Sequence, residues 1–240
     1  MLSIFNDLAR YVNQGGKRKG SIAAYLEPWH SDIMAFLELR KPTGAETERT
    51  RDLFLALMIP DLFMKRVEAG ETWSLFSPDQ APELLDSYGE DFERAYVAAE
   101  EKELFHEQLP AREVFNAILE SQMETGMPYM VYKNSVNQKS NMKHVGTIRS
   151  SNLCAEITLC SGTKEHAVCN LASISLRHFV DQKTKTVDFE KLIETSNFVA
   201  KSLDRVIDLN LYPTPQAEYA NKQHRPIGIG VQGLADVFFK

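Results

Sequence analysis

Residues 52–77, DLFLALMIPDLFMKRVEAGETWSLFS, decide the fold class of this chain. The segment 52–59 is almost entirely apolar, which fits either a buried strand or a buried helix. Pro60 suits the first turn of a helix, and residues 61–69 carry helical spacing that ends at Gly70. Residues 72–77 predict a strand.

The same alternation continues on both sides of this stretch. Apolar spacing predicts helices over residues 2–12, 30–39, 113–124 and 188–208, and strands over residues 21–26 and 128–132. The most polar stretch, residues 77–108, predicts surface helices that take no part in the core. Short strands that alternate with helices indicate an α/β fold.

The composition is that of an ordinary globular protein, with 240 residues, 43% hydrophobic residues and a net charge of −6. No run of about eighteen apolar residues predicts a transmembrane helix, and the first residues lack the pattern of a signal peptide. The acidic balance argues against a general nucleic-acid binder, but it permits a basic pocket for one phosphorylated ligand. The three cysteines favour a reducing, cytoplasmic setting over a disulfide scaffold.

Two patterns weakly suggest cofactors. Residues 228–233, GIGVQG, match the glycine pattern of dinucleotide-binding turns. That site also needs an acidic residue about twenty positions later, and the sequence ends before it, so a tight strand-to-helix turn is the favoured interpretation. The spacings between Cys154, Cys160 and Cys169 differ from the paired hooks of zinc sites, so no metal site is predicted.

The segment 152–156, NLCAE, carries more specific chemistry. In an extended segment, Asn152, Cys154 and Glu156 would project to one face as an amide, a thiol and a carboxylate. The nearby carboxylate opposes thiolate formation, and burial would oppose it further. This favours a neutral thiol that gives up a hydrogen atom over the nucleophile of a cysteine hydrolase. An ordinary strand with a buried cysteine has the same spacing.

Segments 152–157 and 167–173 strongly resemble the active-site region of the class I ribonucleotide reductase large subunit. Further similar stretches, in the same order, are residues 11–16, 25–30, 59–64 and 224–235. The resemblance covers essentially the whole chain. It implies a ten-stranded α/β barrel with a central finger loop that carries a radical cysteine. It also implies that residues 1–240 are a partial catalytic barrel domain, truncated at both ends.

The resemblance implies a role for each residue of the motif. Cys154 would become the thiyl radical that removes hydrogen from the 3′ carbon of the ribose. Glu156 would take the proton of the 3′ hydroxyl, and Asn152 would hold the ribose hydroxyls. Cys169 would be one half of the redox-active dithiol, whose second cysteine lies upstream of this chain in the family. Cys160 stands where the family has no expected cysteine, and is either inert or a stray thiol near the active site.

Residues 14–21 resemble the loop through which the family relays the identity of a bound effector to the substrate site. The residues that carry this likeness are Gln14, Gly15, Gly16, Lys17, Arg18 and Gly20. The glycines permit rearrangement, and the basic side chains offer hydrogen-bond donors to a base or a phosphate. The loop is one residue shorter than the family form, and Gln14 and Arg18 are the best candidates for contacting substrate or effector.

The resemblance also implies partners. The parent protein would reduce ribonucleoside diphosphates for DNA precursor synthesis, and the isolated fragment would be inactive. No cofactor is expected in this chain, because a metal-containing small subunit supplies the radical. ATP and deoxynucleoside triphosphates would act as effectors, and a thioredoxin- or glutaredoxin-type protein as reductant. The full-length form would be a homodimer that binds neither nucleic acid nor membrane. A glycyl-radical enzyme on a similar barrel and a non-catalytic nucleotide-binding module are the alternatives.

Overall fold

The computed structural model describes residues 1–240, with the side chain of Gln14 outside the described part. The chain divides into two compact units, Met1–Cys160 and Ser161–Lys240. Each unit is built from helices and short strands, so the α/β expectation is confirmed.

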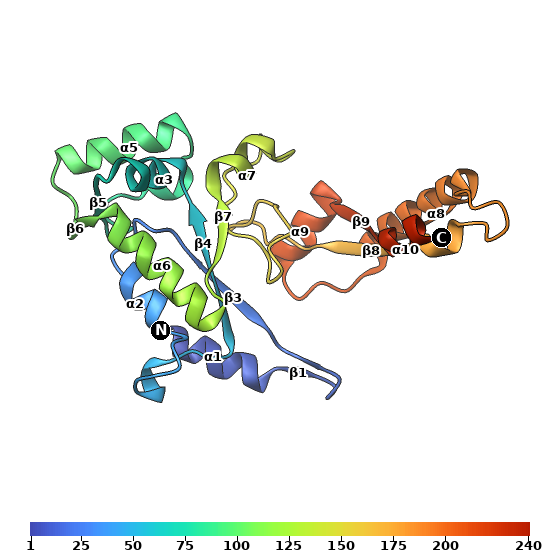
Figure 1. Cartoon of the computed structure of the whole chain (residues 1–240), viewed down its shortest axis with the longest axis horizontal. Helices are drawn as coiled ribbons and strands as arrows, with labels where there is room; N and C mark the ends of the chain where they lie inside the picture. Colours follow the sequence, from blue (N-terminus) through green and yellow to red (C-terminus); the bar gives the residue numbers. More distant parts are fainter. The chain divides into compact units, whose positions relative to one another are not determined.

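A three-stranded parallel sheet forms the centre of the first unit (Figure 1). The middle strand, β4 (Leu53–Ile59), lies between β3 (Ile22–Leu26) and β7 (Tyr129–Tyr132). Every residue of β4 except the half-buried Phe54 is buried. A parallel strand covered on both faces has a continuous apolar sequence, which explains why residues 52–59 alone did not distinguish strand from helix.

The other elements of the first unit surround this sheet. Its helices are α1 (Leu2–Tyr11), α2 (Ile33–Glu38), α3 (Asp61–Ala69), α4 (Glu83–Asp86), α5 (Glu90–Glu101), α6 (Ala111–Thr125) and α7 (Lys133–Lys139), with a 3₁₀ turn at Glu46–Glu48. Two antiparallel pairs join β1 (Asn13–Gln14) to β2 (Arg18–Lys19) and β5 (Thr72–Leu75) to β6 (Glu107–Pro110). The predicted helices and strands are confirmed to within three residues at each end, and α3 has the predicted bounds.

The prediction that residues 77–108 stay outside the core is wrong. Phe92 and Tyr96 on α5 are fully buried, because the helix is amphipathic and its apolar face packs against the core. The ring of Tyr96 stacks on Trp73 with a centroid distance of 4.4 Å. Its hydroxyl donates to the carbonyl of Ser74 at 2.9 Å and accepts from the Ser74 N–H at 2.7 Å. Burial raises the pKa of the Tyr96 phenol.

The second unit contains two parallel strands, β8 (Asn170–Ser175) and β9 (Ile227–Gln232). Its helices are α8 (Phe189–Leu209), α9 (Pro215–His224) and α10 (Leu234–Phe239), with a 3₁₀ turn at Leu176–Phe179. The described residues form no closed barrel, because the five parallel strands belong to two separate sheets.

The glycines of residues 228–233 serve strand pairing and a turn. Gly228 lies inside β9, where a Cβ atom would come within 2.8 Å of the Leu171 side chain on β8. Gly233 has a φ of +75° and makes the turn into α10. The glycine pattern therefore forms the predicted strand-to-helix connection.

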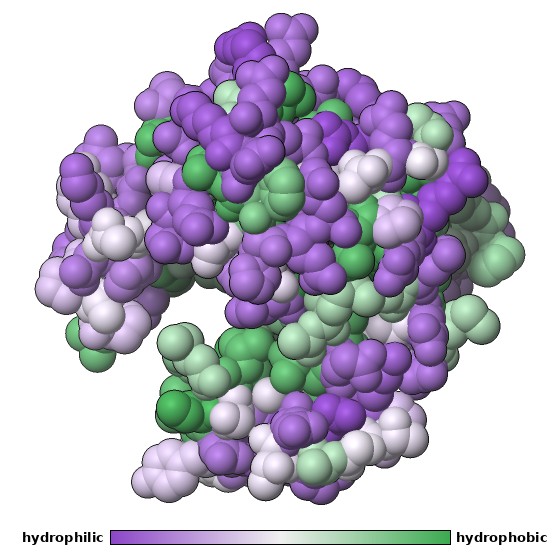
Figure 2. All heavy atoms as spheres, turned by 90° about the vertical axis from the view of Figure 1, so that its left-hand side faces the viewer, coloured by the Kyte–Doolittle hydropathy of each residue, from purple (hydrophilic) through white to green (hydrophobic). Residues whose placement is uncertain are grey.

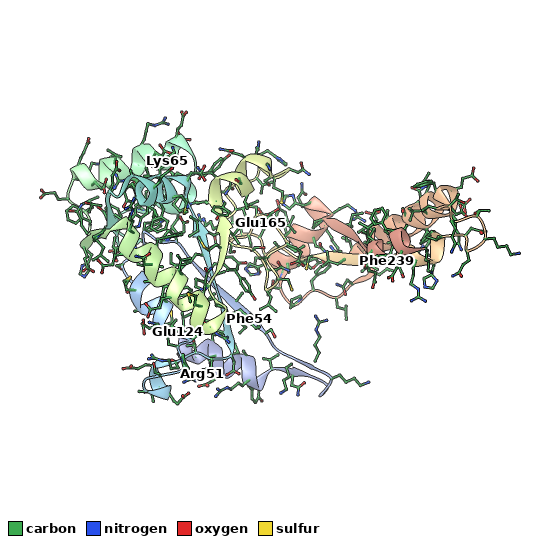
Figure 3. The ribbon with its side chains drawn as sticks, in the orientation of Figure 1. Arg51, Phe54, Lys65, Glu124, Glu165 and Phe239 are labelled. Atoms are coloured by element: carbon green, nitrogen blue, oxygen red, sulfur yellow. The ribbon has the colours of Figure 1, made fainter. Side chains whose placement is uncertain are left out.

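Polar contacts fix the end of α9 within the second unit. His224 lies 2.7 Å from the carboxylate of Glu165, which is labelled in Figure 3. Arg225 adopts a φ of +46°, and its guanidinium donates to Asp204 at 2.7 Å and to Asp208 at 2.8 Å on α8. Together these contacts hold the connection that leads into β9.

The face of the molecule drawn in Figure 2 is mostly hydrophilic, with hydrophobic side chains gathered in a few patches. Within the part of the chain that the structure describes, no helix combines the length and the apolar character needed to cross a membrane.

Candidate functional site

Residues 147–160 form a loop whose two limbs meet at its base. The sulfur of Cys160 lies 4.0 Å from the carbonyl oxygen of Thr147, and a Cβ atom on Gly146 would lie 3.1 Å from the same sulfur. The N–H of Cys160 donates to the sulfur of Met142 at 3.5 Å. Cys160, unexpected from the family pattern, therefore packs at the base of this loop.

The tip of the loop is closed by hydrogen bonds of its own. The hydroxyl of Ser151 donates to the carbonyl of Ile157 at 2.6 Å, and the N–H of Ile157 donates to Oδ1 of Asn152 at 3.2 Å. The N–H of Ala155 donates to the carbonyl of Asn152 at 3.3 Å. Asparagine often closes loops in this way, because its side chain competes with the backbone for hydrogen bonds. Cys154 lies at the closed tip.

The expectation that residues 152–156 are extended is wrong. Ala155 has a φ of +64°, so the segment turns at this position and does not project three side chains to one face. Cys154 and Glu156 are exposed, and Asn152 is half-buried. The expected burial of the thiol is therefore also wrong for this chain.

The polar groups of the tip can still meet a ligand. The side-chain N–H₂ of Asn152 and the carboxylate of Glu156 make no hydrogen bond or ion pair with the described residues. The tip thus offers an amide donor, a thiol and a carboxylate acceptor within five consecutive residues.

Two tyrosines of the central sheet lie near the loop, and neither was predicted from the sequence. Tyr25 on β3 and Tyr129 on β7 pair with Ala56 from opposite sides, so they lie on one face of the sheet. The hydroxyl of Tyr25 donates to the carbonyl of Asn152 at 2.9 Å. Burial raises the pKa of both phenols, and the nearby Cys154 adds to the rise. The tyrosines within these otherwise apolar strands were the available signal.

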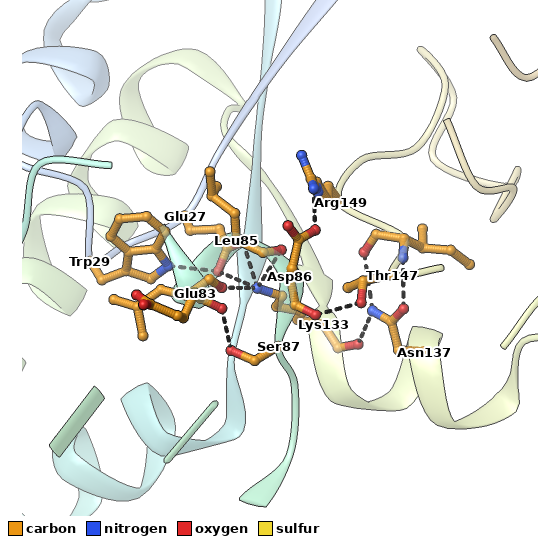
Figure 4. Close-up of polar contacts among 12 residues, drawn as sticks. Glu27, Trp29, Glu83, Leu85, Asp86, Ser87, Lys133, Asn137, Thr147 and Arg149 are labelled. Carbon is orange, nitrogen blue, oxygen red and sulfur yellow. Dashed lines mark hydrogen bonds and ion pairs between the residues drawn. The ribbon is translucent and has the colours of Figure 1, made fainter. Parts of the chain in front are cut away.

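A buried ion pair lies where β3 and β7 end. Glu27 and Lys133 directly follow these strands, and Nζ of Lys133 lies 2.7 Å from one carboxylate oxygen of Glu27 and 3.0 Å from the other (Figure 4). Lys133 also donates to the carbonyl of Leu84 at 2.7 Å, and the indole of Trp29 donates to Glu27 at 2.7 Å. Burial raises the pKa of Glu27 and lowers that of Lys133. The sequence patterns did not predict this pair, although each charge directly follows an apolar strand.

Cys169 belongs to the second unit, whereas Cys154 belongs to the first. It is exposed and directly precedes β8. The next residue, Asn170, is buried, and its amide donates to Asn221 at 2.7 Å and to the carbonyl of Pro226 at 2.9 Å. The backbone beside the Cys169 thiol is therefore held in place while the thiol itself is accessible.

The predicted communicating loop is a short antiparallel hairpin. Strands β1 and β2 pair with Gln14 opposite Arg18, and Gly15 and Gly16 make the turn with φ values of +60° and +75°. The N–H of Gly20 donates to a carbonyl of the preceding segment at 2.7 Å, which fixes the base of the hairpin. Arg18 and the lysine on either side are exposed, and the side chain of Gln14 lies outside the described residues.

Among the described residues, no group of three or more histidine, cysteine, aspartate or glutamate side chains is placed to hold a metal ion.

The family is shown by comparison with known proteins. Residues 1–240 match the family model described as "Ribonucleotide reductase, barrel domain". The chain belongs to the ribonucleotide reductase family. The membership indicated by the motifs is thereby confirmed.

The relatives of this reductase chain are large subunits. It is 54% identical over 239 residues, 99% of its length, to the ribonucleoside-diphosphate reductase large subunit of Plasmodium falciparum (isolate Dd2). It is 53% identical over all 240 residues to the large chain of Schizosaccharomyces pombe, and 53% identical over 239 residues, again 99% of its length, to the large subunit of Danio rerio. The matches cover 30%, 29% and 30% of those proteins, so the chain spans about 30% of the length of the relatives it matches.

Proposed function

We propose that the reductase containing this chain converts ribonucleoside diphosphates into 2′-deoxyribonucleoside diphosphates by thiyl-radical chemistry at Cys154. The observation that carries this proposal is the closed loop 147–160, which holds Cys154 at its tip between an amide donor and a carboxylate. The relatives named as ribonucleoside-diphosphate reductases support the substrate class.

The remaining length of the reductase would supply the rest of a ten-stranded barrel around this loop. The two parallel sheets of the chain would each contribute strands to it. The loop would then be the central finger loop, and the tip would lie away from solvent. Such enclosure is required because a sulfur radical exposed to water would be lost to side reactions.

The proposed reaction begins on the ribose. The sulfur radical of Cys154 takes the 3′ hydrogen atom, which forms the thiol and leaves an unpaired electron on the 3′ carbon. Glu156 accepts the proton of the 3′ hydroxyl and passes it to the 2′ hydroxyl, which leaves as water. The amide of Asn152 donates to a ribose hydroxyl and orients the ring.

Two electrons and two protons must then enter to complete the reduction. The thiol of Cys169 and a second thiol outside this chain supply them and become a disulfide. Cys154 finally returns its hydrogen atom to the 3′ carbon and recovers the sulfur radical. In sum, one ribonucleotide and two thiols yield one deoxyribonucleotide, one disulfide and one water.

The same proposal assigns partners. A small subunit with a metal centre would generate the radical, and a thioredoxin- or glutaredoxin-type protein would reduce the disulfide. The hairpin around Gly15 and Gly16 would relay the identity of a bound nucleotide effector, because its exposed basic side chains can donate to base or phosphate. The large subunit would act as a homodimer.

The test of this function is an assay of the intact reductase with its small subunit, a dithiol and labelled cytidine diphosphate. We expect deoxycytidine diphosphate to accumulate, with one water lost from each substrate molecule. A full-length protein that assembles with its small subunit and binds the nucleotide but forms no deoxynucleotide would contradict the proposal.

Replacement of Cys169 by serine is expected to stop multiple turnover while leaving radical formation at Cys154 intact. Its thiol is accessible and its neighbour Asn170 holds the backbone, so serine should fit without a change of fold. Product should stay well below one equivalent per active site, because each turnover consumes both thiols of the reducing dithiol and one of them is absent. Product per enzyme, measured with excess dithiol, checks this. Normal cycling of the variant would rule out the assigned role.

A further inference from the structure

Asn137 on α7 holds the first limb of the loop 147–160, the Cys154 loop. Its Oδ1 accepts from the N–H of Ile148 at 2.7 Å, and its Nδ2 donates to the carbonyl of Ile148 at 3.0 Å (Figure 4). Nδ2 also donates to the carbonyl of Lys133 at 2.9 Å. Asn137 is 2% exposed and Ile148 is 1% exposed. The amide side chain thus pairs with the backbone of Ile148 as a neighbouring strand would.

The other contacts of this segment are more exposed. The hydroxyl of Thr147 donates to the carbonyl of Asp86 at 2.6 Å, and Arg149 forms an ion pair with the Asp86 carboxylate. An exposed ion pair contributes little to stability, whereas buried hydrogen bonds are costly to leave unmade. The Asn137 bonds are therefore the most deeply buried polar attachment of this limb to the first unit.

A second attachment lies closer to the tip. Tyr25 donates to the carbonyl of Asn152, four residues after Ile148. The first limb of the loop is thus tied at Ile148 to α7 and at Asn152 to β3. Two fixed points on one limb set the direction in which the tip leaves the sheet, and with it the position of the Cys154 sulfur.

We propose that Asn137 is a positioning residue, which aims the Cys154 loop through its paired hydrogen bonds to Ile148. The inference rests on the proposed reductase function, because only chemistry at Cys154 gives the aim of the loop a consequence. Hydrogen-atom transfer requires close approach of sulfur and ribose carbon, so a small misplacement of the loop lowers the rate of the chemical step more than it lowers substrate binding.

Three variants of the intact reductase test this role. Asn137→Leu removes both bonds to Ile148 at similar volume. Asn137→Asp keeps the acceptor for the Ile148 N–H, but an ionised carboxylate cannot donate to the carbonyl. Asn134→Leu is the matched control, since Asn134 is also buried on α7 and its Oδ1 has no partner among the described residues.

For Asn137→Leu we expect kcat to fall at least about 10-fold while KM stays within about twofold. Amide hydrogen exchange at Ile148 should accelerate about 10-fold or more, because a loss of about 1.4 kcal/mol of protection corresponds to tenfold. Asn134→Leu should leave both quantities near the wild-type values. An equal fall in kcat for the two leucine variants would reduce Asn137 to a structural residue and overturn the proposal.

Asn137→Asp provides a readout that a merely structural role would not move. Burial beside two carbonyl oxygens should raise the pKa of the new carboxyl well above its usual value. Below that raised pKa, the protonated acid can again donate to Ile148. Both kcat relative to wild type and the protection of the Ile148 amide should therefore recover as the pH falls below it, and they should not recover in Asn137→Leu.

The two readouts separate the possible failures. If wild-type reductase forms no deoxynucleotide, the proposed function fails, and exchange at Ile148 still reports whether Asn137 holds the loop. If wild type is active and Asn137→Leu keeps wild-type kcat, or if the aspartate variant shows no recovery with falling pH, the positioning role is wrong.

Discussion

Replacement of Cys154 by serine is expected to abolish deoxynucleotide formation by the intact reductase. An O–H bond is much stronger than an S–H bond, so the serine hydroxyl cannot be converted into the radical that removes the 3′ hydrogen. We expect a rate loss of at least about 10³-fold, which corresponds to about 4 kcal/mol of activation free energy. The Cys154 side chain takes no part in the hydrogen bonds that close the loop, so folding and nucleotide binding should persist. Product formation and nucleotide binding, measured on the same preparation, check this.

The matched control for this variant is Cys160→Ser, since Cys160 lies on the same loop but packs at its base. This control should retain most of the activity. If the Cys154→Ser reductase still forms product at a comparable rate, Cys154 is not the hydrogen-abstracting residue, and the chemistry assigned to the loop tip is wrong.

The second large effect is expected at the buried ion pair. In Lys133→Met, the carboxylate of Glu27 stays buried with Trp29 as its remaining donor, and breaking a buried pair in this way costs about 3–5 kcal/mol. The urea concentration at the midpoint of unfolding should therefore fall. The double variant Glu27→Gln/Lys133→Met removes both charges and should recover much of this loss.

The loss in Lys133→Met should also depend on pH. Without the lysine, burial raises the pKa of Glu27 in the folded state above its value in the unfolded chain, so the protonated form is favoured on folding. The cost is therefore smallest at acidic pH, below the unfolded pKa, and grows as pH rises through the folded pKa.

Lys65→Met is the matched control, because Lys65 forms an exposed ion pair with Glu93 on the surface. It should change the free energy of unfolding by no more than about 1 kcal/mol, with little dependence on pH over the same range. Equal destabilisation by Lys65→Met and Lys133→Met would show that burial of an ion pair does not determine its contribution to the free energy of unfolding.

Local sequence patterns predicted much of the fold correctly, because they depend on residues close together in the chain. Pro60 and Gly70 mark the two ends of α3, and the apolar spacing of α6 and α8 locates both helices. The prediction that α5 lies outside the core was wrong, because its many acidic residues suggested an exposed helix although Phe92 and Tyr96 are buried. Only the rings of Trp73 and Phe76, brought to this helix by tertiary packing, show that its inner face belongs to the core.

The candidate site was likewise predicted from sequence only in part. The residues Asn152, Cys154 and Glu156 were found from sequence, since their chemistry and motif lie within five positions. Their expected extended arrangement was wrong. The side chain of Asn152 accepts a hydrogen bond from the N–H of Ile157, and the backbone turns at the residue between Cys154 and Glu156. An alternating pattern cannot reveal such competition between a side chain and the backbone.

The amino-acid sequence alone determined the family, the α/β class and the residue types that can carry thiol chemistry, because these are properties of short motifs and local spacing. The tertiary structure alone decided what supports the loop. Lys133 meets Glu27 across 106 positions of the chain, and Tyr25 meets Asn152 across 127. Such contacts arise only once parallel strands fix which strand ends lie together, because strand register is set by the whole sheet.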